Sequence, residues 1–426
     1  MGKLIITVRI HWFSPLAPAH TAIADYTGRV AGALAARADL TLWTDEPYWY
    51  PGLGKIARVR RFDPREMPWE ELHEGAIFYN IGNNSRFHRA IWEVARRSPG
   101  FAVMHDVLMH DSVAHAHRVR NDPAGYLEIM QSLYGARGRR DAELHWNGVI
   151  NLLQMGRIYS CAPFLLEMSL GAIVHSQAAE QALAREVDVP VIRMPLPFPA
   201  GRPPAAHDGP PPWNLVVFGF LGANRCLEQT LTALARLADP RFHLHIYGDV
   251  EEPAKLSAAI ERLQLAGQVT VHGFVPEVEL DSALASAHLA LNLRYPTKGE
   301  ASYSQLRIWS HGLPSLVTRI GWYAELPAGT ASFVRPDFLV EDIAAHLRAY
   351  AAQPAAYQAS GMRGYEYFVE RHSPRGYAAR IVDLAARMPE FRRQWNERRM
   401  RARAAEAARG WLPEGLPPDI LRSSVS

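Results

Sequence analysis

The chain has 426 residues, of which 48% are hydrophobic and 21% charged, and its net charge at pH 7 is +3. A chain of this length exceeds the size at which one hydrophobic core keeps growing, so we expect two domains. The composition is ordinary for a globular protein with a sizeable core and does not favour disorder. So small a net charge gives no global field for a nucleic-acid partner, and we expect none. Cys161 and Cys226 are too few for a disulfide framework and lie outside any CxxC or Cys/His metal pattern, which favours a reducing, cytoplasmic location.

The chain begins with a short apolar run that stops at Ile10 and is followed by HWFSP. This run lacks a small-residue cleavage site, so we interpret it as a first β-strand and not as a signal peptide. No window approaches 18 consecutive apolar residues, so the sequence predicts no membrane span.

Short β-branched or apolar runs then alternate with longer stretches of helical spacing. The strands predicted in the first half are Leu4–Val8, Leu40–Trp43, Ala76–Tyr79, Phe101–Met104, Ala172–His175 and Val191–Met194. The helices predicted between them include Tyr26–Ala38, Phe87–Arg97 and Ser176–Arg185. The next stretch, Phe198–Trp213, holds six prolines and two glycines, which exclude a helix or a central strand and indicate a linker.

The same alternation restarts after this linker. Its predicted elements are Leu215–Phe218, Cys226–Leu237, His243–Tyr247, Ala254–Leu265, Val269–His272, Glu277–Ala287, Leu289–Leu293 and Ser302–His311. Strands that alternate with helices indicate βαβ units and a parallel sheet covered on both faces. We therefore predict a doubly wound N-terminal domain over residues 1–198, a linker over 199–213, a second such domain over 214–376 and a C-terminal segment over 377–426. The active cleft should lie between the domains, outside the carboxyl ends of the strands.

The tail from Tyr377 to Arg409 is helical in pattern and basic. Residues 391–409 hold seven Arg against two Glu, a net charge of +5, and interleave Trp395 and Met400 with the arginines. Two interpretations stay open: a solvated helical face packed on the N-terminal domain, or attraction to an anionic membrane surface or lipid-phosphate acceptor.

The first strand is not followed by the GxGxxG of a dinucleotide-binding domain, which argues against NAD. The second domain opens with NLVVFGFLGANRCLEQTL, in which Gly219 and Gly222 allow close backbone approach. Asn224 is expected to cap the following helix, and Arg225 in its first turn offers a fork for phosphate oxygens. This turn is a candidate diphosphate clamp, although glycine-rich turns of this kind also occur where nothing binds.

A stronger signal is RYPTKGEASYSQLRIWSHGLPSLVT, from Arg294 to Thr318. A loop carrying Gly299 and Glu300 precedes a predicted helix, and Ser302 and Ser304 place hydroxyls at its positive end. Glu300 has two interpretations: a charge that satisfies the helix dipole, or a carboxylate that grips donor-sugar hydroxyls.

The pairs His105-Asp106 and His110-Asp111 could suggest a metal-dependent phosphohydrolase. That class needs further ligands along helices, whereas His105 ends a strand pattern, so we expect no metal site. A position at a strand end supports His105 as a sugar-contacting residue. His110, His115 and His117 are expected to be structural or on the surface, His175 to pack or line the cleft, and the turn at Asn80–Asn84 to line the acceptor side.

Five stretches together carry a family resemblance: HGFVPEVELDSALASAHLALNLRYPTKGEASYSQLRIWSHGLPSLVT, FGFLGANR, SPLAPAHTAIADYTGRV, AVMHDVLMHD and PFLLEMSLGAIVHSQ. They resemble parts of retaining glycosyltransferase family four. The first stretch resembles the family's donor domain, and the second resembles its basic phosphate contact. The other three resemble the acceptor-side first loop, the loop with a histidine near the reacting sugar and the strand before the interdomain crossover. The resemblance reaches to about Met388. It implies the GT-B fold, two Rossmann-like domains facing a central cleft, with C-terminal helices crossing back to the N-terminal domain.

The resemblance also implies a set of site residues. The catalytic set is His105, Glu300 and Arg225. The donor and phosphate set adds Gly219, Gly222, Asn224, Gly273, Phe274, Val275, Gly299, Ala301, Ser302, Ser304 and Arg307. The acceptor side includes Ala22, Asp25 and Asn83, of which Asp25 equally reads as a first-turn helix charge.

One departure from the family pattern concerns the ribose. The family often has two glutamates eight positions apart, the second reaching the ribose. Aligned on HGLP, the second position is Arg307 and the first is Gly299, with Glu300 beside it. The ribose contact is therefore left open, and Arg307 becomes a candidate for phosphate contact.

The function that the resemblance implies is metal-independent, retaining transfer of mannose or a related hexose from a nucleoside-diphosphate sugar. No cofactor is expected beyond this co-substrate. The expected acceptor is a glycan or lipid-linked glycan in surface polysaccharide or lipopolysaccharide assembly, with the enzyme cytoplasmic or peripheral at the inner face of the membrane. Two alternatives stay open. One is a nucleotide-sugar epimerase or a phosphorylase on the same fold, for which Lys298 is the nearest lysine. The other is a catalytically silent sugar-binding partner of another transferase, which the missing second glutamate favours and the retained Glu300 and Arg225 disfavour.

Overall fold

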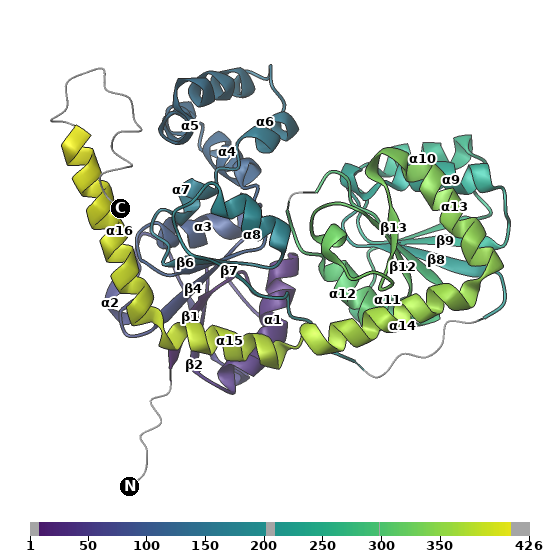
Figure 1. Ribbon diagram of the computed structural model, residues 1–426, viewed down its shortest axis with the longest axis horizontal. Helices are drawn as coiled ribbons and strands as arrows, with labels where there is room; N and C mark the ends of the chain where they lie inside the picture. Colours follow the sequence, from purple (N-terminus) through teal and green to yellow (C-terminus); the bar gives the residue numbers. More distant parts are fainter. Residues whose placement is uncertain (1–7, 202–208, 298, 410–426) are drawn as a thin grey trace, which may run out of the picture.

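The computed structural model of the protein describes residues 8–201, 209–297 and 299–409. Two parallel sheets, of seven and six strands, are each flanked by helices (Figure 1). This is the doubly wound α/β architecture expected from the sequence.

The first sheet has the strand order β3-β2-β1-β4-β5-β6-β7, and its neighbouring strands are all parallel. Its strands are β1 (Arg9–Phe13), β2 (Asp39–Thr44), β3 (Arg58–Arg61), β4 (Ala76–Ile81), β5 (Phe101–Met104), β6 (Gly171–Val174) and β7 (Val191–Arg193). The helices between them are α1 (Ala22–Ala35), α2 (Trp69–Leu72), α3 (Ser85–Ala95), α4 (His110–Val119), α5 (Pro123–Trp146), α6 (Leu152–Ile158), α7 (Ala162–Leu166) and α8 (Gln177–Ala184). The strand order reverses between β1 and β4, so the topological switch point lies there.

The second sheet has the order β10-β9-β8-β11-β12-β13, again with parallel neighbours. Its strands are β8 (Trp213–Phe218), β9 (Phe242–Tyr247), β10 (Val269–Gly273), β11 (Leu289–Asn292), β12 (Ser315–Thr318) and β13 (Ser332–Val334). Its helices are α9 (Leu227–Leu237), α10 (Pro253–Arg262), α11 (Glu277–Ser286), α12 (Tyr303–Ser310), α13 (Leu339–Ala352) and α14 (Pro354–Arg371). Its switch point lies between β8 and β11.

Two strands of the first sheet differ from the sequence prediction. Strand β1 runs over Arg9–Phe13, so the predicted strand Leu4–Val8 is placed too early, and residues 4–7 of it lie outside the described part of the chain. Trp12 and Phe13 are fully buried between β2 and β4, which explains why the strand continues past the apolar run. Strand β3 was not predicted, because its sequence RVRR is polar and it pairs only at the edge of the sheet. In the predicted linker, Trp213 already belongs to β8, and residues 202–208 lie outside the described part of the chain.

Two connections between the halves of the molecule meet at His372. The chain leaves α14 there and enters α15 (Pro374–Ala386), which packs against α1 of the first half (Figure 1). His372 Nδ1 bonds to the carbonyl of Leu196 at 2.7 Å, and the N–H of Phe198 donates to the carbonyl of His372 at 2.8 Å. The segment after β7 and the joint between α14 and α15 are therefore tied to each other.

The C-terminal helices pack on the first half through aromatic side chains. The hydroxyl of Tyr377 accepts a hydrogen bond from Tyr26 at 2.6 Å, and the Phe391 ring of α16 (Met388–Arg409) meets Phe101 edge-on at 5.0 Å. Trp395 is half-buried against the same core, whereas Met400 is exposed. At least one face of the basic helix is therefore used for packing. Within the described residues, no helix is long and apolar enough to cross a membrane.

Candidate functional site

The turn after β8 brings three predicted site residues to one point. Gly219 has φ +106°, in the left-handed region that favours glycine. A Cβ built on Gly219 would lie 3.9 Å from Nη2 of Arg225 and 3.9 Å from Oγ of Ser304. The glycine turn and the first turn of α12 therefore converge beside the switch point of the second sheet, where open α/β sheets bind ligands.

Arg225 is a buried cation at this point. It lies in the short 3₁₀ turn η2 (Ala223–Arg225) and is only 4% exposed. Its Nη2 donates to the carbonyl of Phe218 at 2.6 Å and its Nη1 to Oδ1 of Asn292 at 3.5 Å, while its Nε has no hydrogen-bond partner among the described residues. Burial, and then the neighbouring charge of Arg294, lower the pKa of the guanidinium to about 10, so it stays cationic at pH 7.

The expected cap of the following helix by Asn224 is wrong. Helix α9 begins at Leu227, its N-cap is Cys226 in a left-handed conformation, and no side chain caps it. Asn224 instead accepts a hydrogen bond from the N–H of Tyr295 at 2.8 Å through its backbone carbonyl. This bond connects the turn formed by residues 219–225 to the loop that follows β11.

Arg294 and Glu300 form a second charged pair in that loop. Nη1 of Arg294 lies 3.1 Å from Oε1 of Glu300, and the side chains are 22% and 15% exposed. Burial alone would lower the pKa of Arg294, but the Tyr323 phenol and the Glu300 carboxylate raise it above its usual value. The other carboxylate oxygen of Glu300 accepts a hydrogen bond from Thr297 at 3.0 Å. The carboxylate is therefore held beside a cation, and it does not cap α12.

Ser302 is the residue that caps α12. Its hydroxyl accepts from the N–H of Gln305 at 3.1 Å and from Nδ2 of Asn292 at 3.2 Å, and the side chain is 1% exposed. Asn292 also donates to Oε1 of Gln305 at 3.0 Å. One amide at the end of β11 thus connects Arg225 to the N-terminus of α12. The Ser302 hydroxyl accepts both of these bonds, so its own O–H is the atom that the predicted phosphate contact would use.

The loops carrying Gly299 and Phe274 face the first half of the molecule. Gly299 has φ +86°, and a Cβ built on it would lie 2.4 Å from Cγ2 of Val107. Phe274 is 67% exposed and its ring meets His20 edge-on at 6.2 Å. The neighbours of these residues are less exposed: Gly273 ends β10 with φ +69°, and Val275 and Ala301 are half-buried against the core.

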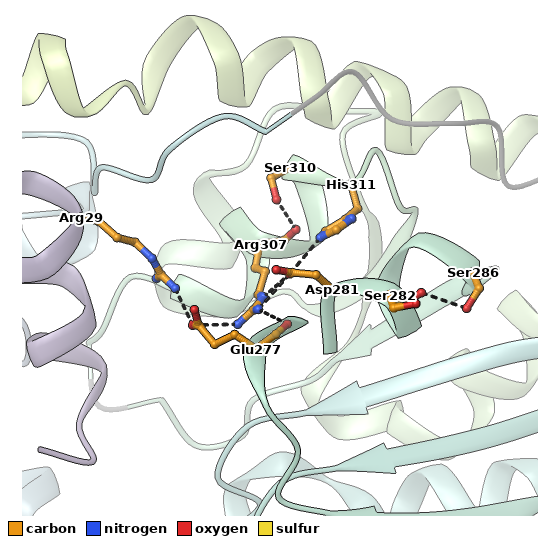
Figure 2. Close-up of polar contacts among 8 residues, drawn as sticks. All are labelled: Arg29, Glu277, Asp281, Ser282, Ser286, Arg307, Ser310 and His311. Carbon is orange, nitrogen blue, oxygen red and sulfur yellow. Dashed lines mark hydrogen bonds and ion pairs between the residues drawn. The ribbon is translucent and has the colours of Figure 1, made fainter. Parts of the chain in front are cut away.

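Arg307 is engaged by carboxylates of α11 (Figure 2). Its Nη2 lies 2.8 Å from Oδ1 of Asp281, and its Nη1 lies 3.3 Å from Oε1 of Glu277. Arg29 reaches the same Glu277 oxygen from α1 of the first half, at 2.9 Å. A phosphate contact by Arg307 would require this network to open.

His105 lies directly after β5, in the first half. Its Nε2 is 3.2 Å from Oδ1 of Asn80, and its ring meets that of Tyr26 edge-on at 4.7 Å and that of His175 at 5.3 Å. Burial, and then the nearby His175 and His88, lower the pKa of His105 well below its usual value. Nδ2 of Asn80 donates to the carbonyl of Phe13 at 2.9 Å, so its Oδ1 is the atom that faces His105. The imidazole is therefore neutral at pH 7 and donates through Nε2.

The other predicted residues of the first half lie in the first turn of α1, beside α4 or in contacts within their own half. Asn83 uses Oδ1 to accept from the N–H of Ser112 at 2.8 Å, and Ala22 and Asp25 lie in the first turn of α1. His110, His115 and His117 bond to other side chains of their own half, Tyr126, Ser85 and Asp122 respectively. Within the described residues no three His, Cys, Asp or Glu side chains are grouped as metal ligands would be. Lys298 lies outside the described residues.

Sequence reasoning gave no role to Asn292 and Arg294, and it placed Asn80 in a turn on the acceptor side without its contact to His105. Arg294 was quoted in the loop after β11 but given no role. All three stand at or just after the carboxyl end of a strand, and that position was the signal that could have found them.

These observations describe a polar, cationic site on the second sheet. Residues 213–353 match the family model of the glycosyl transferases group 1. The match spans the second sheet and α9 to α13, including Arg225, Arg294 and Glu300.

Solved glycosyltransferase structures share the fold of nearly the whole chain. HepE of Anabaena, in complex with UDP, has a TM-score of 0.61 at 14% identity and covers 88% of this chain and 99% of its own. Sucrose-phosphate synthase from Thermosynechococcus elongatus has a TM-score of 0.59 at 16% identity, covering 88% of this chain and 98% of its own. A glycosyltransferase from Rickettsia africae has a TM-score of 0.56 at 11% identity, covering 89% and 98%. No curated protein matches the chain. The expected GT-B fold is confirmed, and at these identities the likeness concerns the fold alone.

Proposed function

We propose that the protein is a glycosyltransferase that moves a hexosyl unit from a nucleoside-diphosphate sugar, with retention of configuration, to a glycan or lipid-linked acceptor. The observation that carries this proposal is the buried Arg225 beside the part-buried pair of Arg294 and Glu300, at the carboxyl ends of the strands of the second sheet. The family match over residues 213–353 supports glycosyl transfer. The UDP bound to HepE makes UDP the first nucleotide to test.

The chemistry assigns each of these groups a task. As the sugar leaves, negative charge develops on the diphosphate, and two preorganised guanidinium groups stabilise it more in the transition state than in the ground state. Nε of Arg225 and Nε of Arg294 are buried donors that no described residue uses, which supports a role toward a bound anion. Because these cations supply positive charge, we propose that the reaction proceeds without a metal ion.

Retention needs no side-chain nucleophile in this proposal. The acceptor oxygen bonds to the anomeric carbon on the face from which the diphosphate departs, and the acceptor's proton passes to a phosphate oxygen. Neutral His105 orients the sugar, and Glu300 accepts hydrogen bonds from its hydroxyls. Mannose or a related hexose, and an acceptor of surface polysaccharide assembly, remain part of the proposal.

Release of nucleotide tests the activity. The wild-type protein, incubated with a panel of UDP- and GDP-hexoses, should release free UDP or GDP from one of them, and EDTA should leave the rate unchanged. Adding an acceptor should increase that rate and yield a product whose anomeric configuration is that of the donor, as read by NMR. Absence of nucleotide release from every donor, with and without acceptor glycans, would favour the catalytically silent alternative.

The basic helix α16 supports association with an anionic membrane. Each well-placed Arg adds about 1 kcal/mol of attraction to such a surface. We expect the protein to sediment with anionic vesicles at low salt, less so as ionic strength rises, and not with neutral vesicles. A chain truncated after Asn396 keeps the packed residues Phe391 and Trp395 and serves as the matched variant. Equal sedimentation of both chains would show that the arginines after Asn396 do not bind the membrane.

A further inference from the structure

One carboxylate at the junction of the two halves is held in an unusual way. Glu277 receives Arg29 of α1 at 2.9 Å and Arg307 of α12 at 3.3 Å, and both contacts fall on Oε1 (Figure 2). Oε2 has no hydrogen-bond partner among the described residues, and the side chain is 63% exposed. Two cations from different halves therefore fix one oxygen and leave the other available.

The arginines themselves are less available than this oxygen. Arg307 is 11% exposed, and its three nitrogens are used by Asp281, the Glu277 side chain and the Glu277 carbonyl. The guanidinium of Arg29 lies 4.7 Å from the ring centroids of both Phe198 and Tyr303. Nη1 of Arg29 also has no hydrogen-bond partner among the described residues, but that atom is buried. The exposed atom of this cluster that stays free is thus Oε2 of Glu277, an acceptor, which suits a ligand with hydroxyl groups.

The position of Glu277 in the fold indicates which ligand hydroxyls its free oxygen would bind. It is the first residue of α11, which follows β10, and the loop between them presents the exposed ring of Phe274. In Rossmann-like domains a ligand lies outside the carboxyl ends of the strands, and an acidic residue there accepts hydrogen bonds from ribose hydroxyls. We propose that Glu277 binds the ribose of the donor nucleotide, its Oε2 accepting hydrogen bonds from the 2′ and 3′ hydroxyls. This inference rests on the proposed function.

A purely structural role makes a different prediction. An acid in the first turn stabilises a helix, and an exposed ion pair contributes at most about 1 kcal/mol, so Glu277 could serve only to hold α11 and join the two halves. In that case its loss would weaken every nucleotide equally. A ribose contact would instead matter only for nucleotides that carry the hydroxyls.

Calorimetric titration of the full chain with UDP and with 2′,3′-dideoxy-UDP separates the two roles. We expect the wild-type protein to bind the dideoxy compound about ten- to a hundredfold more weakly, because it loses hydrogen bonds to a charged acceptor. Glu277→Gln should bind UDP more weakly and lose most of this discrimination, which is the non-additivity of a direct contact. Glu279→Gln, on the same helix turn and also exposed, is the matched control and should discriminate as the wild type does.

The remaining outcomes overturn the assignment. If Glu277→Gln weakens UDP and dideoxy-UDP by the same factor, the carboxylate is structural. A wild-type protein that binds both compounds equally rejects a ribose contact altogether, while nucleotide release from a UDP-sugar would still support the proposed function. If the wild-type protein binds neither UDP nor GDP, the proposed function falls together with this site.

Discussion

Replacing Arg225 with alanine should lower turnover by about two to three orders of magnitude, the loss typical of removing one preorganised donor from a developing negative charge. The structure adds a second effect. Because Arg225 is buried and donates to Phe218 and Asn292, its removal takes a donor away from two buried oxygens. We expect a loss of about 1–3 kcal/mol in the free energy of unfolding.

Both effects are measurable on one sample. Nucleotide release gives the turnover, and urea unfolding gives the stability. Arg236→Ala is the control, since Arg236 is 59% exposed and, among the described residues, pairs with Glu341 on the surface of the same half. Its turnover and stability should stay near wild type. If Arg225→Ala keeps wild-type turnover at a temperature where it is folded, Arg225 stabilises the fold and takes no part in transfer.

Changing Glu300 to glutamine should show whether its carboxylate serves Arg294, the donor sugar or both. The substitution removes the carboxylate that pairs with the part-buried guanidinium of Arg294, so the protein without ligand should lose about 3 kcal/mol of stability. UDP supplies negative charge to the same place, and at a hundredfold excess over its Kd it should return about 2.7 kcal/mol. Binding of free UDP should be retained.

Turnover decides whether Glu300 also holds the sugar. If the carboxylate only neutralises Arg294, saturating UDP-sugar should restore a near-normal rate, because the diphosphate then takes over that task. If Glu300 accepts hydrogen bonds from the sugar, the rate at saturation should stay far below wild type. Glu341→Gln, which removes an exposed carboxylate, is the control for both readouts. A normal rate in Glu300→Gln would remove the residue from the proposed catalytic set.

Several predicted site residues lie where the sequence placed them but make other contacts than those expected. Glu300 was weighed as a helix-dipole charge, but Ser302 caps α12 and Glu300 pairs with Arg294. Asn224 was expected to cap α9, but it connects two loops. Arg307 was a candidate for phosphate, but it holds Glu277 and Asp281. The partners of Asn224 and Arg307 come from another element, and the partner of Glu300 is a residue of its own loop.

The two parallel sheets, the glycine turn after β8 and the loop before α12 could all be predicted from the amino-acid sequence. These features follow from local patterns: alternation of apolar runs with helical spacing, and glycines where the backbone turns. The roles of Asn80, Asn292, Arg294 and Glu277 were decided only by the tertiary structure. Arg225 meets an amide 67 positions away, and Glu277 meets an arginine 248 positions away. The partner of a polar group, its burial and therefore its charge depend on which strand ends the fold brings side by side, and no local pattern carries that information.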